Sequence, residues 1–329
     1  MPRLFRTMRN PSERANPCGD TMKLAALDVG TNTVLMLVAE ETPDGGVRKL
    51  ADLSRITRVG RGVDSIGKLD PAAAQTTLDT IADFVDQART LGATKVLSAA
   101  TAALRDVADG ADFIARVKAR CGIDLDIISG ETEAQLSYLS SVKGLKLDPS
   151  AKLLIVDIGG GSTELVRAQP GGAIDAVSLQ IGSVRLTERY VHSDPPHPRE
   201  AADLRLAIDG ALEGLRWNFA PDLMVGIAGT VTTIAAVALG LAQYDPDRVH
   251  GYQLTEAEVL RTIGLFGCVG LEDRKRLPGL EAGRADVIFA GAAILERMMA
   301  HFKIDRVTVS DQGVRWGLVW REIERPSTT

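Results

Sequence analysis

The segment Leu24-Ala-Ala-Leu-Asp28-Val-Gly30-Thr-Asn-Thr33 decides the fold, because its pattern occurs a second time in the chain. The second copy reads Leu153-Leu-Ile-Val-Asp157-Ile-Gly-Gly-Gly161-Ser-Thr-Glu164. Each copy consists of an apolar strand, an Asp-x-Gly turn and a second apolar run, and runs bounded by such turns indicate β-hairpins. A Pro/Gly turn and a third strand candidate follow in both copies, at 47–59 and at 173–181. The repeat therefore predicts a duplicated molecule with two similar lobes.

Helical and strand patterns alternate after each copy, which favours an α/β fold with parallel strand pairs in both lobes. We expect helices at 71–91, 100–121, 131–143, 200–217, 255–266, 285–302 and 313–323, and strands at 95–99, 123–128 and 306–310. The uncharged segment 223–244 has the length of a membrane span. Its glycines and threonines instead favour a strand at 223–227, a turn at 228–230 and a buried helix at 231–241.

The chain divides into three predicted regions. Residues 1–22 are polar and basic and lack the apolar core of a secretory signal, so we expect a disordered tail. Residues 23–130 form the first lobe and residues 131–313 the second. We expect the terminal helix, within 314–329, to pack back onto the first lobe and complete it.

Composition places the chain among ordinary globular proteins and argues against a binder of nucleic acid or of anionic membranes. Of its 329 residues 45% are hydrophobic and 25% charged, and the net charge is −5. An acidic balance argues against nucleic acid or an anionic membrane as partner. Three widely spaced cysteines predict reduced thiols and a cytoplasmic location. The histidines lack zinc-site spacing, and His192 and His197 flank a Pro-rich turn that we interpret as a surface loop.

The two Asp-Gly turns are candidate phosphate-binding loops. Small residues let backbone N–H groups converge on phosphate oxygens, and hydroxyl and amide side chains add donors. Asp28 and Asp157, at the ends of their strands, can hold Mg²⁺ between such phosphates. Alternatively each aspartate only caps its own turn, but the repetition favours phosphate. The candidate residues are Gly30, Thr31, Asn32, Thr33, Gly159, Gly160, Gly161, Ser162 and Thr163.

Other polar residues fit either a site or ordinary structure. Gly229 and Thr230 stand where a strand meets a helix, whose N-terminus attracts anions but also needs a cap. Glu133 lies in a first helical turn, where carboxylates are favourable in any case. Glu164 can reach the site of Asp157 or remain an exposed strand carboxylate.

The arginines are equally ambiguous. The guanidinium of Arg105 can bind phosphate with two hydrogen bonds, or it can pair with Asp106 on a helix surface. Arg284 and Arg315 allow the same two interpretations.

Taken together, the motifs resemble the exopolyphosphatase/guanosine pentaphosphate phosphohydrolase family, from about Met22 to the terminal helix. Besides the two Asp-Gly turns, they are Ala100-Thr-Ala-Ala-Leu-Arg105, Ser129-Gly-Glu-Thr-Glu133-Ala134, Gly229-Thr230, Arg248-Val-His-Gly251, Arg284-Ala-Asp286 and Ser310-Asp-Gln-Gly313-Val-Arg315. The resemblance implies two ribonuclease-H-like lobes of the actin-like, sugar-kinase-like clan, with a phosphate-binding cleft between them.

The resemblance also implies roles for single residues. Glu133 corresponds to the general base that acts on the attacking water. Asp157 and Glu164, with Asp28, correspond to ligands of Mg²⁺ or Mn²⁺, and Arg105 belongs with the catalytic group. The remaining matches, at the two loops, Gly229, Thr230 and Arg284, contact phosphate.

Two departures from the family pattern stand out. Gln135 occupies a position where the family often has Arg. The chain is expected to be a short form without the helical C-terminal domain of longer members, so processive handling of very long polymers is not expected.

The predicted reaction is Mg²⁺-dependent release of orthophosphate from the end of inorganic polyphosphate, by a homodimer. The alternatives are removal of the terminal phosphate of guanosine pentaphosphate, kinase-like transfer to a second acceptor, and non-catalytic binding of polyphosphate or an alarmone.

Overall fold

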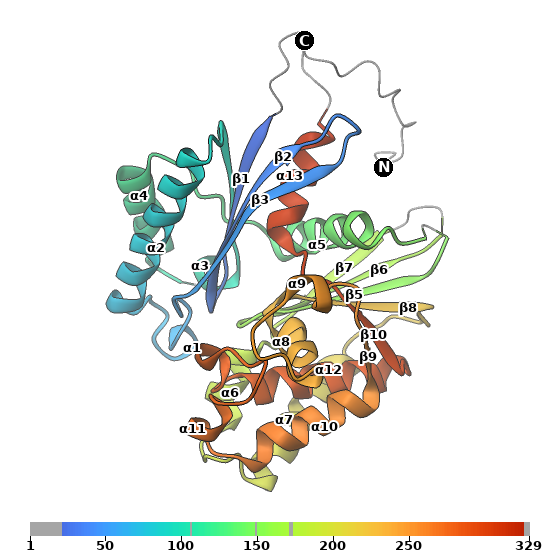
Figure 1. Cartoon of the computed structure of the whole chain (residues 1–329). Coiled ribbons are helices and arrows are strands. Elements are labelled where there is room, and N and C mark those ends of the chain that lie inside the picture. Colours follow the sequence, from blue (N-terminus) through green and yellow to red (C-terminus); the bar gives the residue numbers. More distant parts are fainter. Residues whose placement is uncertain (1–21, 106, 149, 171–173, 326–329) are drawn as a thin grey trace.

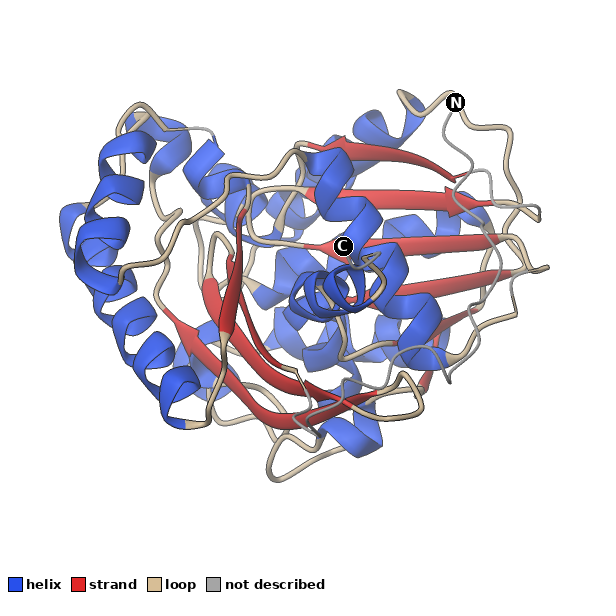
Figure 2. Ribbon diagram, turned by 90° about the horizontal axis from the view of Figure 1, so that it is seen from above, coloured by secondary structure: helices blue, strands red, loops and turns tan. Residues whose placement is uncertain are grey.

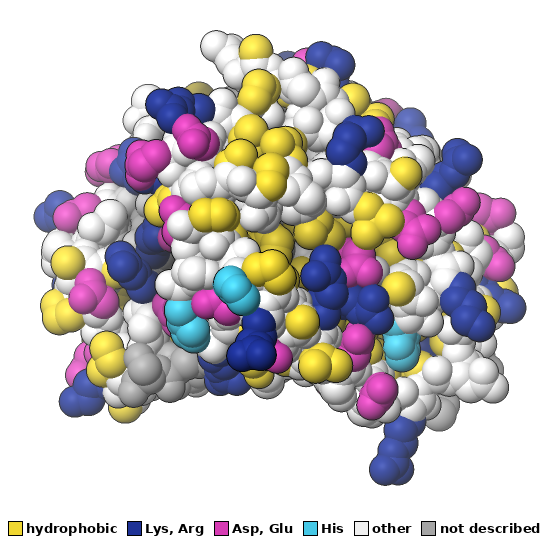
Figure 3. Space-filling view, turned by 90° about the horizontal axis from the view of Figure 1, so that it is seen from below, with side chains coloured by type: hydrophobic (Ala, Val, Ile, Leu, Met, Phe, Trp, Pro, Cys, Tyr) yellow, Lys and Arg dark blue, Asp and Glu magenta, His cyan; other side chains and the backbone are white. Residues whose placement is uncertain are grey.

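The computed structural model describes residues 22–325 except 106, 149 and 171–173, so the predicted N-terminal tail lies outside the described residues. The described chain forms two β-sheets, each packed with helices (Figure 1). Within these residues, none of the helices combines the length and the apolar character that a membrane span requires. Acidic and basic side chains are mixed over the face seen in Figure 3, in keeping with the small net charge.

The first sheet has four strands in the order β3-β2-β1-β4. Its strands are β1 (Lys23–Val29), β2 (Thr33–Glu41), β3 (Val47–Ile56) and β4 (Lys95–Ala100). The first three form an antiparallel meander, and β4 returns parallel to β1. This return needs a crossover, which α2 (Pro71–Thr90) supplies. Asp70 caps α2 by accepting a hydrogen bond from the backbone of Ala73 at 2.8 Å.

The second sheet repeats this plan and extends it, in the order β7-β6-β5-β8-β10-β9. Its strands are β5 (Leu153–Ile158), β6 (Thr163–Ala168), β7 (Ile174–Leu179), β8 (Leu223–Ile227), β9 (Gln253–Thr255) and β10 (Arg306–Val309). Here β5, β6 and β7 form the antiparallel meander, and β8 and β10 run parallel to β5. The repeat seen in the sequence is thus a repeat of structure.

The remaining helices surround the sheets. They are α1 (Val63–Ile66), α3 (Ala102–Arg105), α4 (Gly110–Cys121), α5 (Gly130–Leu145), α6 (Ser183–Tyr190), α7 (Pro198–Glu213), α8 (Ala228–Ala238), α9 (Pro246–Val249), α10 (Glu256–Cys268), α11 (Leu271–Arg274), a 3₁₀ turn (Ala282–Arg284), α12 (Ile288–Phe302) and α13 (Val314–Ile323). The outer faces carry α2 and α4 on the first sheet and the group around α12 on the second.

Two helices lie between the sheets. α13 buries Val314, Leu318 and Val319 against Leu24 and Leu37 of the first sheet. α5 covers the facing side of the second sheet, and α5 and α13 pack against each other (Figure 2). The last helix of the chain therefore covers a face of the first sheet.

Three predicted elements differ from the structure. The helix expected at 100–121 is divided into α3 and α4, because Ala100 belongs to β4 and α4 begins only at Gly110. The strand expected at 123–128 is a single bridge between Ala100 and Ile127, because β4 ends at Ala100 and leaves it no longer partner. The turn expected at 228–230 is absent, because Ala228 adopts a φ of 66° and α8 begins directly after β8. The proposed lobe boundaries stay a prediction.

Candidate active site

Four carboxylates gather where the central strands end beneath the first turn of α5. Asp28 lies on β1, Asp157 on β5 and Glu164 on β6, and Asp157 and Glu164 are paired across the hairpin. Glu133 lies in the first turn of α5. Burial, and after it the negative charges of Glu164, Asp157 and Asp28, raise the pKa of Glu133. The fold thus unites the acidic residues that the sequence singled out.

Glu133 is held at the beginning of α5. The side chain of Ser129 caps the helix by accepting a hydrogen bond from the backbone of Thr132 at 3.1 Å. Only 7% of Glu133 is exposed, and its Oε2 atom has no hydrogen-bond partner among the described residues. Nη1 of Arg105 lies 3.7 Å from that oxygen. Burial, reinforced by the neighbouring carboxylates and opposed by Arg105, raises the pKa of Glu133 well above 4.5.

Two serines that the sequence analysis did not single out orient the other carboxylates. Ser137 donates to Oδ2 of Asp157 at 3.1 Å, and Ser178 donates to Oε1 of Glu164 at 2.7 Å. Ser137 lies four residues after Glu133 on the same helix face, and this spacing is a signal that could have identified it. Burial raises the pKa of Asp157 to about 6 and that of Glu164 to about 7, although both hydrogen bonds oppose the rise.

Asp28 is the carboxylate nearest to the first sheet. Burial, helped by the charge of Asp157, raises its pKa to about 7, and the charge of Arg315 opposes the rise. Arg315, ambiguous in the sequence, is buried and donates to both carboxylate oxygens of Asp52 at 2.9 and 3.0 Å and to the carbonyl of Asp311 at 3.1 Å. Arg315 thus ties α13 to the first sheet.

The carboxylates suit a hard divalent cation. Buried oxygens of Asp28, Glu133 and Glu164 have no hydrogen-bond partner in the part of the chain that the structure describes. Mg²⁺ prefers such oxygen donors and usually takes only one or two carboxylates, completing its shell with water and substrate phosphate. Among the described residues, no group of three or more His, Cys, Asp or Glu side chains is arranged to hold a metal ion.

The two hairpin turns face each other across the site. The backbone of Gly30 donates to the carbonyl of Thr33 at 3.0 Å, and that of Gly159 donates to Ser162 at 3.0 Å, so the turns have the same form. A Cβ atom on Gly160 would lie 2.9 Å from the Cβ of Thr31. Only a glycine lets the two loops approach so closely.

The packing of each turn leaves backbone N–H groups free. The carbonyl of Thr31 accepts from Gly60 at 2.9 Å, and the carbonyl of Gly160 accepts from Val184 at 2.9 Å. In a trans peptide the following N–H points the opposite way. The N–H groups of Asn32 and Gly161 therefore point away from these partners, and neither donates a hydrogen bond within the described residues.

The N-terminus of α8 meets the first turn through Arg284. The Nη2 atom of Arg284 donates to the hydroxyl of Thr33 at 3.3 Å, and the Nε atom of Arg284 donates to Glu281 at 3.1 Å. The guanidinium lies directly on Gly229, since a Cβ there would stand 2.2 Å from Nη1. Arg284, Gly229 and the first turn are thus brought together.

Some predicted phosphate contacts are engaged elsewhere. The hydroxyl of Thr230 donates to the carbonyl of Ile158 at 3.0 Å, and that of Thr163 donates to Ile181 at 2.6 Å. Both hydroxyl protons are donated to backbone carbonyls next to the second turn, so they are not directed into the cleft. Arg105 donates to the carbonyl of Ile128 at 2.9 Å, and its alternative partner Asp106 lies outside the described residues.

A cavity of about 340 Å³ adjoins the first turn and lies between the two halves of the molecule. Arg58, which the sequence analysis did not single out, spans this gap, donating to the carbonyl of Gly283 at 2.8 Å and to Asp286 at 3.0 Å. The polar residues of its lining are Thr31, Asn32, Arg58, Arg61, Thr187, Glu188, His192 and Asp286. Nδ2 of Asn32 is buried without a hydrogen-bond partner in the described chain.

Comparison with known proteins identifies the family. A model of the Ppx/GppA phosphatase family matches residues 37–325. The chain belongs to this family. "Exopolyphosphatase 2" of Mycobacterium tuberculosis is 33% identical to this Ppx/GppA chain over 311 residues, which are 90% of the chain and 97% of that protein. "Exopolyphosphatase 1" of Mycobacterium bovis is 30% identical over 307 residues, 92% of the chain and 89% of that protein.

Solved structures agree with this assignment. The Ppx/GppA family member of Aquifex aeolicus superposes with a TM-score of 0.80 at 30% identity, covering 94% of this chain and all of that one. An exopolyphosphatase-like protein gives a TM-score of 0.86 at 28% identity, covering 92% and 98%. The resemblance, the fold of two α/β lobes and the assignment as a phosphate-releasing hydrolase are thereby confirmed.

Proposed function

We propose that this Ppx/GppA phosphatase releases orthophosphate from the end of inorganic polyphosphate. The observation that carries the proposal is the buried carboxylate of Glu133 beside two facing glycine-rich turns. Its Oε2 atom has no hydrogen-bond partner among the described residues and lies 3.7 Å from Nη1 of Arg105. The similarity to two exopolyphosphatases supports the choice of substrate. The homodimer and the cytoplasmic location stay predictions.

In this proposal Glu133 accepts a proton from the attacking water and orients it toward the terminal phosphorus. A general base works best when its pKa lies near the working pH, and burial raises the pKa of Glu133 in that direction. The terminal phosphoryl group lies between the turns, where the N–H groups of Asn32 and Gly161 and the guanidinium of Arg284 stabilise its charge. The reaction breaks the phosphoanhydride bond, and the shortened chain leaves with the bridging oxygen.

One or two of the carboxylates of Asp28, Asp157 and Glu164 would hold Mg²⁺ or Mn²⁺, with water and substrate phosphate as the other ligands, and the ion would neutralise charge on the phosphate oxygens when it is bound. The hydrogen bonds from Ser137 and Ser178 fix two of these carboxylates in the site. Phosphoryl transfer depends mainly on such positioning and charge.

The cavity beside the first turn is the place for the rest of the phosphate chain. It begins at Thr31 and Asn32. Its wall carries the positive charges of Arg58 and Arg61 and the negative charges of Glu188 and Asp286, and Asp286 is paired with Arg58. The unpartnered amide of Asn32 offers a hydrogen bond to a phosphate oxygen.

Guanosine pentaphosphate is the second candidate substrate. Three valines, Val184, Val191 and Val287, line the same cavity and give apolar surface to a nucleoside. Ligand sites for organic molecules are mostly apolar with a few polar groups, whereas a bare phosphate chain needs donors and cations.

A phosphate-release assay on purified protein tests the proposal. It compares tripolyphosphate, long polyphosphate, guanosine pentaphosphate and ATP, each with and without Mg²⁺. We expect orthophosphate from polyphosphate, and less from ATP. Orthophosphate from guanosine pentaphosphate alone would select the second candidate. No orthophosphate from any compound, with polyphosphate still bound, would refute hydrolysis and favour a binding protein.

A further inference from the structure

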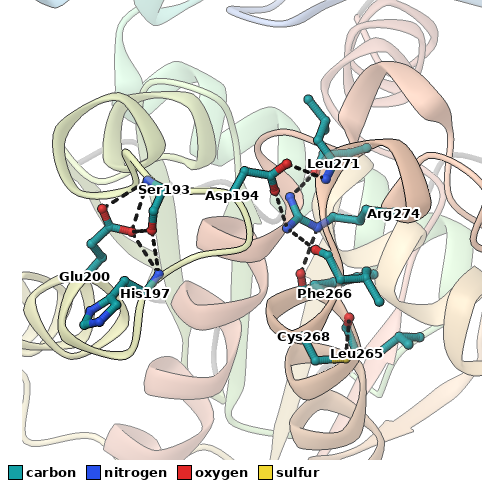
Figure 4. Close-up of polar contacts among 11 residues, drawn as sticks. Ser193, Asp194, His197, Glu200, Leu265, Phe266, Cys268, Leu271 and Arg274 are labelled. Carbon is teal, nitrogen blue, oxygen red and sulfur yellow. Dashed lines mark hydrogen bonds and ion pairs between the residues drawn. The ribbon is translucent and has the colours of Figure 1, made fainter.

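A buried arginine outside the cleft holds the backbone next to Arg284. Arg274 ends α11 and is only 3% exposed. Its Nε donates to the carbonyl of Phe266 at 2.8 Å, and its Nη2 donates to that of Val269 at 2.9 Å, both at the end of α10 (Figure 4). Its Nη1 donates to the carbonyl of Ala285 at 3.0 Å. One rigid guanidinium thus joins the end of α10 to the residue that follows Arg284.

The fourth contact is made by Asp194, at the same nitrogen that donates to Val269. Asp194 approaches Nη2 of Arg274 at 3.5 Å and accepts a hydrogen bond from the backbone of Leu271 at 2.7 Å. Asp194 belongs to the loop after α6, which is anchored separately because Glu200 accepts hydrogen bonds from Ser193 and His197. Arg274 is therefore held by the end of α10 and by the loop after α6, and this loop also supplies Val191 and His192 to the lining of the cavity.

The segment it holds is a contact between the two halves of the molecule. Ala285 is fully buried and stands between Arg284 and Asp286. Arg284 reaches the hydroxyl of Thr33, and Asp286 pairs with Arg58, which adjoins the same cavity. Fixing the carbonyl of Ala285 fixes the directions in which both neighbours project.

We propose that Arg274 is a positioning residue that holds Arg284 against the first phosphate-binding turn and so sets the affinity for the phosphate chain. This inference rests on the proposed function, in which Arg284 contacts the terminal phosphoryl group. Arg274 itself touches neither substrate nor reacting atoms. A lysine cannot replace it, because a single ammonium cannot reach three carbonyls and a carboxylate in this planar arrangement.

The test is a comparison of Arg274→Lys and Arg274→Met with Arg297→Lys and Arg297→Met. Arg297, on α12, pairs with the carboxylates of Asp209 on α7 and of Glu296. We expect Arg274→Lys to raise KM for tripolyphosphate about tenfold, with kcat changed less than about threefold. The Arg297 variants can lower the melting temperature but should leave KM unchanged. Should Arg274→Met not fold, Arg274→Lys and the milder Asp194→Asn carry the test, and the latter should raise KM by a smaller factor.

A double-mutant cycle with Arg284→Gln separates positioning from general destabilisation. If Arg274 acts through Arg284, the double variant Arg274→Lys/Arg284→Gln should have the KM of Arg284→Gln alone. Multiplying effects, or an unchanged KM in a folded Arg274→Lys protein, would overturn the inference while leaving the proposed function intact. An Arg284→Gln protein with an unchanged KM would instead contradict the role of Arg284 itself, and the inference with it.

Discussion

Replacing Glu133 by glutamine is the most direct test of the chemistry. Glutamine has nearly the same shape, so the packing of this buried side chain should be preserved. It cannot accept a proton from water, and a positioned general base contributes roughly 10²–10⁴-fold. That range corresponds to about 3–5 kcal/mol of activation free energy. We therefore expect kcat to fall by this factor, with KM changed only a few-fold because Glu133 does not hold the phosphate chain.

The same substitution should stabilise the protein. The pKa of Glu133 is raised, so its ionised form opposes folding, and the loss of stability grows as the pH rises above 4.5. Glutamine removes this penalty, and its amide can donate to a neighbouring carboxylate. At pH 8 without added metal, the melting temperature of Glu133→Gln should therefore exceed that of the wild type.

The assay combines orthophosphate release from tripolyphosphate with a thermal melt on the same samples. Glu131→Gln is the matched control, because Glu131 lies on the same helical turn but is exposed. The control should retain both activity and melting temperature. A folded Glu133→Gln enzyme with kcat within about tenfold of wild type would show that another group activates the water.

Three further outcomes follow from the geometry of the site. Gly160→Ala places a methyl group against Thr31 and should separate the turns; kcat/KM for tripolyphosphate should fall at least tenfold, and unchanged kinetics would contradict the facing-turn arrangement. Gly229→Ala displaces the flexible Arg284 side chain, so KM should rise while the melting temperature stays within a few degrees. A large loss of stability would instead show that the substitution disturbs the backbone rather than the Arg284 side chain. Burial raises the pKa of Glu164 from 4.5 to about 7, so the stability it contributes is present below pH 4.5 and is lost as the pH rises through 7. In metal-free wild-type protein, the unfolding free energy should fall between pH 4.5 and 8, and Glu164→Gln should make this fall smaller by up to about 3 kcal/mol. Urea denaturation at a series of pH values measures it. If the variant shows the same fall as the wild type, ionisation of Glu164 is not its cause.

The parts of the fold that depend on local pattern could be predicted from the sequence. Both hairpins were predicted because an Asp-x-Gly turn between apolar runs has few alternative conformations. β8 was predicted with its bounds, and α2 to within one residue, because each is bounded by clear signals. The abrupt entry into α8 could not be predicted, since a positive φ at Ala228 is unusual for a residue with a Cβ.

The contacts between the halves escaped prediction for a different reason. Arg58 pairs with Asp286, and Arg315 with Asp52, more than two hundred residues away in the chain. A single sequence carries no periodicity that relates such distant positions. Asp28 and Asp157 could be predicted because a repeat placed them at equivalent points, and Glu133 only through the family resemblance. Ser178 escaped prediction because its contact depends on strand register.

The position of α13 has a consequence for biosynthesis. The strands of the first sheet leave the ribosome early, but the helix that shields Leu24 and Leu37 emerges only after the whole second half. Until α13 is synthesised, the apolar face of the first sheet stays exposed to solvent. We expect this intermediate to recruit chaperones, and stop codons placed before residue 314 to yield aggregation-prone fragments.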